Sequence, residues 1–415
     1  MSFGELVLLG AVLWWGAASS VHLATIAVAL AHPRYRAARA LNDQTPPVSV
    51  VVPLKGLEPE LEENLAALLA QEYPEYEVLF SVAERSDPAA ALVERAIAGA
   101  SSVPAKLIVG AMPVSSHLKT NNMIKALKAA RHDTILITDC NVRSEPGRIA
   151  ELVRHLGGTQ GLVSATAAGA RPDTEAGELE CAFLNGYGTR FLLTGDLIGF
   201  TAALGKTMLF RMSDLEHAGG LKRLARGVAD DTALTEAIRD CGLQVVMSES
   251  AAVSPVAGRG FEEFWHRHTR WLVYRRDYAP LMFVLEPLAG GLGTTWNAYL
   301  FGHYGVFGLP PLVFVLANLV FWYGAEAVLV RARGWHLEWV SPFAWITRDI
   351  ILPVMWVRSL ISRRVRWKGG VVNVVAQADA ATLIDALDQD GTAEKDPPGS
   401  RAGEGGAADV GRPPQ

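Results

Sequence analysis

An uncharged apolar run near the amino terminus limits what this chain can fold into more than any other feature. Between Leu6 and Ala31 there is no acidic residue, lysine or arginine. A helix of this length is long enough to cross the roughly 30 Å hydrocarbon core of a bilayer. A cleaved signal peptide would have a basic start and a shorter apolar core, whereas the only early charge here is Glu5. We therefore expect residues 1–33 to form a membrane-spanning anchor.

The charges that follow the anchor indicate its orientation. Arg34, Arg36 and Arg39 come directly after the apolar run, and segments rich in arginine stay on the cytoplasmic side of a membrane. The sequence also contains widely spaced cysteines that match neither a disulfide framework nor a metal site, which is typical of thiols in a reducing compartment: Cys140, Cys181 and Cys241. We expect the segment after the anchor to be cytoplasmic.

Composition excludes one class of function and sets the carboxyl terminus apart. The formal net charge is -5, but residues 377–415 alone carry eight acids and three basic residues. The rest of the chain is therefore near neutrality, which excludes a basic nucleic-acid-binding surface. Residues 377–415 are rich in alanine, glycine, proline and acids, a composition that favours disorder.

A second apolar block begins near residue 279. Leu281–Leu300 and Val306–Val330 are each long enough to span a membrane, although Glu286-Pro287 and Gly290-Gly291 weaken the first. A pair of spanning helices returns the chain to the side that it left. We expect a transmembrane helix pair within residues 279–333.

The segment 334–370 is apolar but interrupted. Glu338, Arg348 and Asp349 lie inside its apolar part, Trp335–Val357. A basic cluster follows, and a full crossing would place this cluster outside, against the charge rule: Arg358, Arg363, Arg364, Arg366 and Lys368. We expect an interfacial or re-entrant amphipathic segment with the basic cluster on anionic lipid.

Residues 46–278 alternate between patterns of buried strands and amphipathic helices. We expect strands at Val48–Leu54, Tyr76–Val82, Lys106–Val109, Thr134–Thr138, Leu162–Thr166, Leu204–Arg211 and Gln244–Met247. We expect helices at Pro59–Gln71, Ala89–Ala98, Lys119–Ala130, Pro146–Leu156, Thr174–Arg190, Thr232–Cys241 and Phe261–Tyr274, with a loop containing Gly195, Asp196 and Gly199. Such alternation predicts an α/β domain, with a mostly parallel sheet covered by helices on both faces.

Asp139 is the first candidate for an active-site residue. The strand pattern Thr134–Thr138 ends abruptly on Asp139-Cys140-Asn141, and ligands of α/β enzymes bind at the carboxyl ends of parallel strands. Asp139 can equally cap the next helix or close a solvated turn. The stretch alone does not decide between these roles.

Three further groups of polar residues follow an expected strand or lie at or in an expected helix: the loop Glu84–Asp87, the pair Asp230-Asp231, and the segment Arg267–Trp271. Each has an ordinary structural reading, as a helix cap, as first-turn acids or as a membrane anchor. Converging on one crevice, they would suit a divalent cation and a diphosphate, with a separate carboxylate as general base and arginine plus tryptophan as a clamp.

Several motifs follow one another in order between Val48 and Pro287. They are Val48-Ser49-Val50-Val51-Val52-Pro53-Leu54-Lys55-Gly56, Glu77 to Pro88, Lys119-Thr120-Asn121-Asn122, Asp139-Cys140-Asn141, Gly205-Lys206-Thr207-Met208, Asp230-Asp231 and Arg267-His268-Thr269-Arg270-Trp271. This ordered set resembles the ceramide glucosyltransferase family, membrane-anchored GT-A glycosyltransferases of family 2/21 type, including their bacterial members. The last motif is similar to the family's Gln/Arg-x-x-Arg-Trp signature.

The resemblance implies a GT-A (Rossmann-like) fold and a role for each matched residue. It implies that Glu84 and Asp87 face the nucleoside, and that Asp139 holds the metal and diphosphate with Asn141 as a second metal ligand. It implies that Asp231 is the base and that Arg270 and Trp271 bind the diphosphate and line the acceptor site. The residues implied to contact the donor are Pro53, Lys55, Lys119, Asn121 and Arg267. The implied cofactor is a divalent cation, manganese or magnesium.

The implied reaction is inverting transfer of a hexose, most specifically glucose, from a UDP-sugar to the primary hydroxyl of ceramide, at a bacterial inner membrane. The same chemistry on diacylglycerol or a hopanoid, or with UDP-N-acetylglucosamine or UDP-glucuronate, is the near alternative, and an inactive nucleotide-sugar- or lipid-binding scaffold is the remote one. The chain departs from the family where Glu84 and Ser86 replace aspartates, where Asn141 replaces the second acid of Asp-x-Asp, and near Gly188, where animal members have a histidine.

Overall fold

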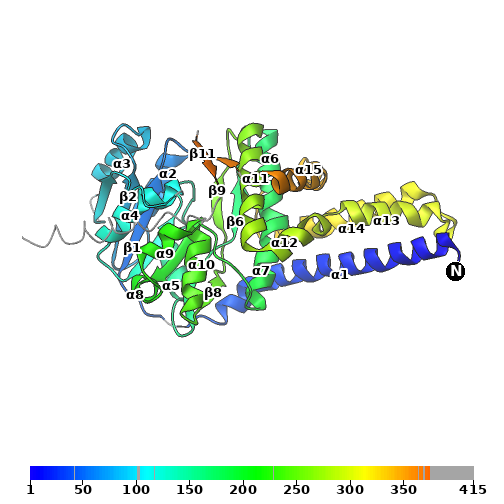
Figure 1. Cartoon of the computed structure of the whole chain (residues 1–415), viewed down its shortest axis with the longest axis horizontal. Coiled ribbons are helices and arrows are strands. Elements are labelled where there is room, and N and C mark those ends of the chain that lie inside the picture. The colour runs from blue at the N-terminus through cyan, green and yellow to red at the C-terminus, as the bar shows by residue number, and fades with distance from the viewer. Residues whose placement is uncertain are drawn as a thin grey trace, which may run out of the picture.

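The computed structural model describes residues 1–41, 43–100, 103–115, 117–227, 229–362, 364–367 and 370–373. The predicted tail, residues 377–415, and the basic-cluster residues Arg363 and Lys368 therefore lie outside the described residues. Figure 1 shows an α/β domain at one end of the molecule and a long stalk at the other, made of the helices α1, α13 and α14.

The α/β domain is built on a seven-stranded sheet with the order β3-β2-β1-β4-β7-β5-β8. The strands are β1 (Val48–Leu54), β2 (Tyr76–Val82), β3 (Ala105–Val109), β4 (Thr134–Thr138), β5 (Gln160–Ser164), β7 (Thr207–Arg211) and β8 (Gln244–Met247). Only β7 runs antiparallel to its neighbours in this sheet. The predicted mostly parallel sheet is confirmed.

Helices cover both faces of this sheet, as predicted. On one face, Val50 and Val52 pack with α2 (Leu61–Leu69), α3 (Pro88–Gly99) and α5 (Arg148–Val153). On the other, Val51 packs with α4 (Leu118–Ala129), α8 (Met212–His217), α9 (Leu221–Arg226) and α10 (Asp230–Asp240). Successive β1 side chains point to opposite faces, and all are buried, which is why its sequence is a continuous apolar run rather than an alternating one.

A second layer joins the sheet domain to the stalk. It contains a small parallel sheet, β6 (Ala167–Ala170) with β9 (Ala252–Pro255), and α6 (Glu175–Ala182), which runs through a π-helical turn (Phe183–Gly188) into α7 (Thr189–Leu197). The expected loop after Arg190 is wrong, because the helix continues to Leu197. Asp196 lies inside this helix because its carboxylate has buried partners on α1.

The carboxyl-terminal apolar block is less regular than its composition indicates. After α11 (Phe261–Tyr278) come α12 (Pro280–Leu285), a 3-10 turn (Glu286–Ala289), α13 (Leu292–His303), a 3-10 turn (Val306–Gly308) and α14 (Pro311–Ala332). Leu281–Leu300 is therefore not one long helix: Pro287 has no amide hydrogen to donate, and Gly290 is extended. Among the described residues, α1 (Phe3–Ala37) and α14 are the helices long and apolar enough to cross a membrane.

Helix α15 (Ser341–Ile361) packs beside α6 and α11 and is followed by a hairpin, β10 (Arg364–Trp367) with β11 (Gly370–Asn373). One face of α15 is buried through Trp345, Leu352 and Met355, while Ile350 and Val354 are exposed. This two-sided pattern agrees with an interfacial position, which remains a prediction.

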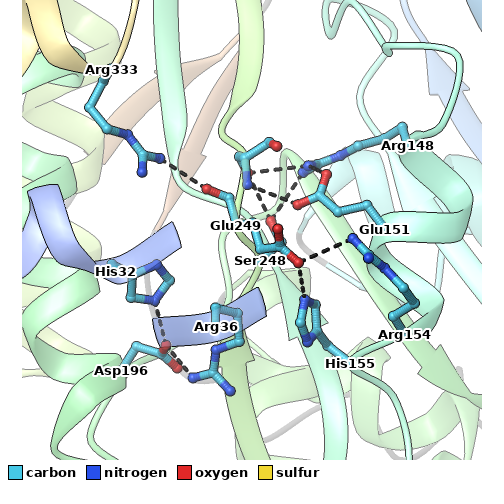
Figure 2. A network of polar contacts seen from close by, with 11 residues as sticks. His32, Arg36, Arg148, Glu151, Arg154, His155, Asp196, Ser248, Glu249 and Arg333 are labelled. Atoms are coloured by element: carbon cyan, nitrogen blue, oxygen red, sulfur yellow. Dashed lines mark hydrogen bonds and ion pairs between the residues drawn. The ribbon is translucent and has the colours of Figure 1, made fainter. Parts of the chain in front are cut away.

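Polar contacts fix α1 to the α/β domain, as Figure 2 shows. The imidazole of His32 lies 2.7 Å from Asp196 Oδ2, and Arg36 donates to the same oxygen. The other oxygen of Asp196 accepts from the backbone amide of Met247. At the end of α14, Arg333 donates to the carbonyl of Glu249. Both membrane-length helices are therefore tied to the sheet around β8.

Candidate active site

The direction of β7 decides which residues meet at the site. Strands β1, β2 and β4 end at one edge of the sheet, and β7 begins there because it is antiparallel. Asp139 directly follows β4, and Lys206 directly precedes β7. Their backbones meet, since the amide of Asp139 donates to the carbonyl of Lys206 at 3.2 Å. Gly205 and Lys206 were expected inside a strand, but they form the turn that enters it.

Lys119 lies at the centre of the site. Its ammonium lies 2.9 Å from Asp139 Oδ1 and 2.8 Å from Asp230 Oδ2, and donates to the carbonyl of Gly205 at 2.8 Å. A cation at the amino end of α4 is unfavourable in the helix dipole, so the two carboxylates are what hold it there. Burial lowers the pKa of Lys119, but Asp139 and Asp230 outweigh burial and raise it.

Asp231 and Asp139 are carboxylates with opposite pKa shifts. Asp231 Oδ2 accepts from the Gly205 amide at 3.0 Å. Burial and the neighbouring Asp230 raise the pKa of Asp231 to about 6. Burial also acts to raise the pKa of Asp139, but Lys119 and Lys206 overcome it and lower that pKa. Asp139 therefore stays ionised, while Asp231 can exchange a proton near neutral pH.

Helix α11 supplies the basic side of the site. The Arg267 guanidinium lies over the Trp271 ring, 5.2 Å from its centroid, and Arg267 Nε lies 3.2 Å from Glu180 Oε1 on α6. Burial lowers the pKa of Arg270 to about 10. Arg267 is near enough to Asp139 to help lower its pKa. The predicted group of Lys119, Asp139, Asp231 and the α11 arginines therefore meets in one place.

Some predicted donor-binding residues have structural roles here. Asp87 caps α3 and accepts from the amide of Gly56 at 3.0 Å, so it fixes the turn after β1 that carries Lys55. Asn121 binds the backbone of Val114 and Ser115 and holds the loop before α4. Whether Asp87 and Asn121 also contact a donor remains a prediction.

Two other predicted residues differ in exposure. Glu84 is exposed, with the Ser86 hydroxyl 3.3 Å from its carboxylate, whereas Pro53 is buried within β1. Whether either one contacts a donor remains a prediction.

The residues fit a divalent cation shared with a diphosphate better than an all-protein cage. Asn141, predicted as a second metal ligand, has its side-chain carbonyl 2.6 Å from the Lys206 ammonium and donates to Glu58 at 3.4 Å. Among the described residues, no group of three or more histidine, cysteine or acidic side chains could hold a metal. Asp139 thus remains the candidate carboxylate ligand, and magnesium or manganese on phosphates commonly uses one or two.

Sequence reasoning missed two buried charged residues of the site. Lys206 was part of a recognised motif, but its place beside Asp139 depends on the direction of β7. Burial lowers the pKa of Lys206 to about 8. Glu180 was one acid among several in an expected helix, and it is 1% exposed beside Arg267 and His268. A buried acid facing a basic helix has no signal in the sequence alone.

Comparison with known proteins gives the family. The family described as glycosyl transferase family 21 matches residues 12–380. The chain belongs to glycosyl transferase family 21. This family 21 enzyme is 24% identical over 332 residues to ceramide glucosyltransferase 1 of Caenorhabditis elegans, covering 78% of this chain and 70% of that protein. With ceramide glucosyltransferase 3 of the same organism, identity is 22% over 358 residues, covering 84% and 77%.

Solved structures similar to the family 21 enzyme are more distant. A mannosyltransferase from Pyrobaculum calidifontis, in complex with GDP-mannose and Mn²⁺, is 20% identical with a TM-score of 0.47, covering 83% of this chain and 99% of that chain. Glucosyl-3-phosphoglycerate synthase from Mycobacterium tuberculosis, with Mn²⁺ and UDP-glucose, is 14% identical with a TM-score of 0.35, covering 57% and 79%. Family membership and the observed sheet confirm the predicted glycosyltransferase class and GT-A fold.

Proposed function

We propose that this family 21 enzyme transfers a hexose, most specifically glucose, from a UDP-sugar to the primary hydroxyl of ceramide, with inversion at the anomeric carbon. The observation that carries the proposal is the pair of oppositely tuned carboxylates around Lys119 and Gly205. An ionised Asp139 suits a leaving diphosphate and its cation, and an Asp231 with a pKa of about 6 suits a general base.

The basic residues around Asp139 bind and orient the leaving group. Lys119, Lys206 and Arg267 are the cations that act on Asp139, and together they surround the carboxyl edge of β4. A divalent cation held by Asp139 and by diphosphate oxygens would neutralise the departing UDP. Arg270 adds a further positive charge, and Trp271, which supports Arg267, offers an apolar wall for the acceptor.

Asp231 removes the proton from the acceptor. As the hydroxyl oxygen of the lipid bonds to the anomeric carbon, its proton passes to the Asp231 carboxylate. The bond from the anomeric carbon to the diphosphate oxygen breaks on the opposite face, and its electron pair leaves with UDP. A single displacement of this kind converts an α-linked donor into a β-linked product.

Two observations support ceramide as acceptor. Ceramide glucosyltransferases are similar to this protein over most of its chain, and helices α1 and α14 are long and apolar enough to cross a membrane. A primary hydroxyl at the membrane surface is the group that such a tethered site can reach. Diacylglycerol or a hopanoid as acceptor, or UDP-N-acetylglucosamine or UDP-glucuronate as donor, would use the same residues. A scaffold that only binds its ligands would keep the fold without turnover.

The test is product formation by the purified full chain with UDP-glucose, ceramide and manganese. We expect a glycolipid whose anomeric proton coupling identifies a β linkage, and we expect Asp139→Ala and Asp231→Ala to abolish UDP release. Variants that match the wild type would show that the assigned roles are wrong. UDP binding without turnover on any UDP-hexose and any lipid hydroxyl would favour the scaffold.

A further inference from the structure

The base of the stalk is surrounded by exposed apolar side chains. On α12, Leu281 is 65% exposed and Val284 is 58% exposed. Helix α15 adds an apolar stripe at helical spacing: Ile350, Val354, Val357 and Ile361. The two helices are joined, because the Trp356 indole donates to the carbonyl of Phe283 at 2.7 Å and their rings stack at 5.2 Å. We call this surface the α12–α15 face.

A second exposed apolar patch lies on the α/β domain. In residues 197–200, which begin at the last residue of α7 and are called here the Ile198 loop, Ile198 is 72% and Phe200 63% exposed. Gly199 has a φ of +73°, and the amide of Phe200 donates to the carbonyl of Gly195 at 2.7 Å. A tight turn therefore presents two large apolar side chains to the outside. Exposed apolar patches of this kind mark protein or membrane contact sites.

Arg239 brings the Ile198 loop next to the α12–α15 face. Its guanidinium donates to the carbonyl of Thr201 at 2.5 Å and lies 3.5 Å from the hydroxyl of Tyr278. It also lies 5.7 Å from the centre of the Phe200 ring. Because Thr201 follows the loop and Tyr278 ends α11, two residues before the start of α12, one side chain links the two apolar patches.

The junction leads to the proposed base. Tyr274 and Tyr278 are one turn apart on α11 and share a face of that helix. Burial raises the pKa of Tyr274 to about 12 and also raises the pKa of Tyr278, and the nearby charge of Asp231 acts on both phenols in the same direction. The shared face of α11 thus runs from the start of α12 toward Asp231.

We propose that the Ile198 loop and the α12–α15 face form one bilayer-embedded surface of the catalytic domain, and that the lipid acceptor reaches Asp231 from this surface along Tyr278 and Tyr274. The occupant is a phospholipid bilayer, because α12 continues through residues 286–289 into α13, which packs with the membrane-length helices α1 and α14. Exposed apolar elements of this type lie about 5–10 Å into the interface. The acceptor path rests on the proposed function; the embedding does not.

Site-directed spin labelling of the full chain tests the embedding without catalysis. Cys140 and Cys181 are buried and Cys241 is partly exposed, so Cys241→Ser gives the background. Nitroxides at Ile198→Cys and Leu281→Cys, with Arg95→Cys on the exposed side of α3 as control, are studied in phosphatidylcholine–phosphatidylglycerol vesicles. Labels at 198 and 281 should be accessible to oxygen and protected from a water-soluble nickel chelate, and the label at 95 should show the opposite. Nickel accessibility at 198 equal to that at 95 would overturn the proposal.

Kinetics test the acceptor path. Ile198→Ser combined with Phe200→Ser should raise the apparent KM for a long-chain ceramide in vesicles by about tenfold, leave the KM for UDP-glucose unchanged, and have little effect on a short-chain ceramide in detergent. An equal loss with both acceptors would contradict the path. If no lipid is glycosylated by the wild type, the proposed function fails, while the spin-label result still decides the embedding.

Discussion

Lys119 and Asp231 bind opposite ends of the same residue: the lysine donates to the carbonyl of Gly205, and the aspartate accepts from its amide. The group that fixes Asp139 is thus coupled through one glycine to the proposed base. A Cβ on Gly205 would lie 3.1 Å from the lysine Nζ and 3.4 Å from an Asp231 oxygen. Because glycine has no side chain at this position, Lys119 and Asp231 can both approach the same residue.

Asp231→Asn should remove the base and keep its contact with Gly205. The amide oxygen of asparagine can still accept from Gly205, while its NH2 group replaces the oxygen that accepts from the Thr232 amide, and the side chain cannot take a proton. We expect kcat to fall by about 10²–10⁴-fold with an unchanged KM for UDP-glucose. Initial rates of UDP release in detergent with ceramide measure both constants, and a kcat within twofold of the wild type would assign the base elsewhere.

The rate should depend on pH through Asp231. Burial and Asp230 raise its pKa to about 6, so the carboxylate binds a proton already in mildly acidic solution. Only the ionised form can act as the base, so kcat should be constant above pH about 7 and fall toward tenfold per unit well below pH 6. A profile of kcat from pH 5 to 8 measures this. A wild-type plateau that extends to pH 5 would mean that this carboxylate does not control the rate.

Lys119→Met should weaken both stability and donor binding. It leaves the carboxylates of Asp139 and Asp230 facing each other without the ammonium that now lies between them. The loss of a buried charge partner costs on the order of 3 kcal/mol in unfolding free energy. Lys119→Arg keeps the charge and should lose less. Denaturation in detergent and isothermal titration with UDP compare the variants, and equal behaviour of the two would argue against an electrostatic role.

Glu180→Gln should disturb Arg267. Glu180 is buried, and its pKa is lowered because Arg267 and His268 outweigh the effect of burial. The neutral amide removes the carboxylate that pairs with Arg267, so we expect lower thermal stability and a higher KM for UDP-glucose. Glu178→Gln is the matched control, since Glu178 lies on the same helix but faces His336 at 2.7 Å. Identical effects of the two changes would mean that the loss is not specific to Arg267.

Gly186→Ala should destabilise the junction with the stalk. A Cβ at this position would overlap the carboxylate of Glu326 on α14, which accepts from Arg348 at 2.5 Å. We expect a loss of about 1–3 kcal/mol from overpacking. Gly324→Ala on the same helix as Glu326 meets nothing within 4 Å and should be neutral. Thermal unfolding of the two variants in detergent compares them directly.

Continuous apolar runs gave reliable strand boundaries, whereas tertiary contacts decided what the sequence could not. Val48–Leu54, Tyr76–Val82 and Gln244–Met247 form strands with the expected bounds, because burial on both faces leaves one reading of such runs. The helix through Asp196 was missed because the polar partners of this aspartate, His32 and Arg36, lie far away in the sequence.

The site was predicted as a group of residues rather than as a set of contacts. The meeting of Asp139, Lys119 and Asp231 follows from the carboxyl edge of a parallel sheet, which the strand pattern predicts. The place of Lys206 does not, because the direction of β7 leaves no mark on its composition. This direction also explains Asn141, whose carbonyl oxygen faces a lysine that sequence reasoning had located within a strand.

The continuous helical run from Glu175 to Leu197 makes four spaced contacts with other segments of the chain. Along it, Glu180 meets Arg267, Gly186 lies against Glu326, Arg190 contacts His22, and Asp196 holds Arg36. One inserted or deleted residue would rotate every helical residue beyond it by about 100°. The remaining contact residues would then no longer face their partners. Chimeras between relatives should therefore exchange this segment together with α1, α11 and α14, because the four contacts depend on the spacing of residues in all of these helices.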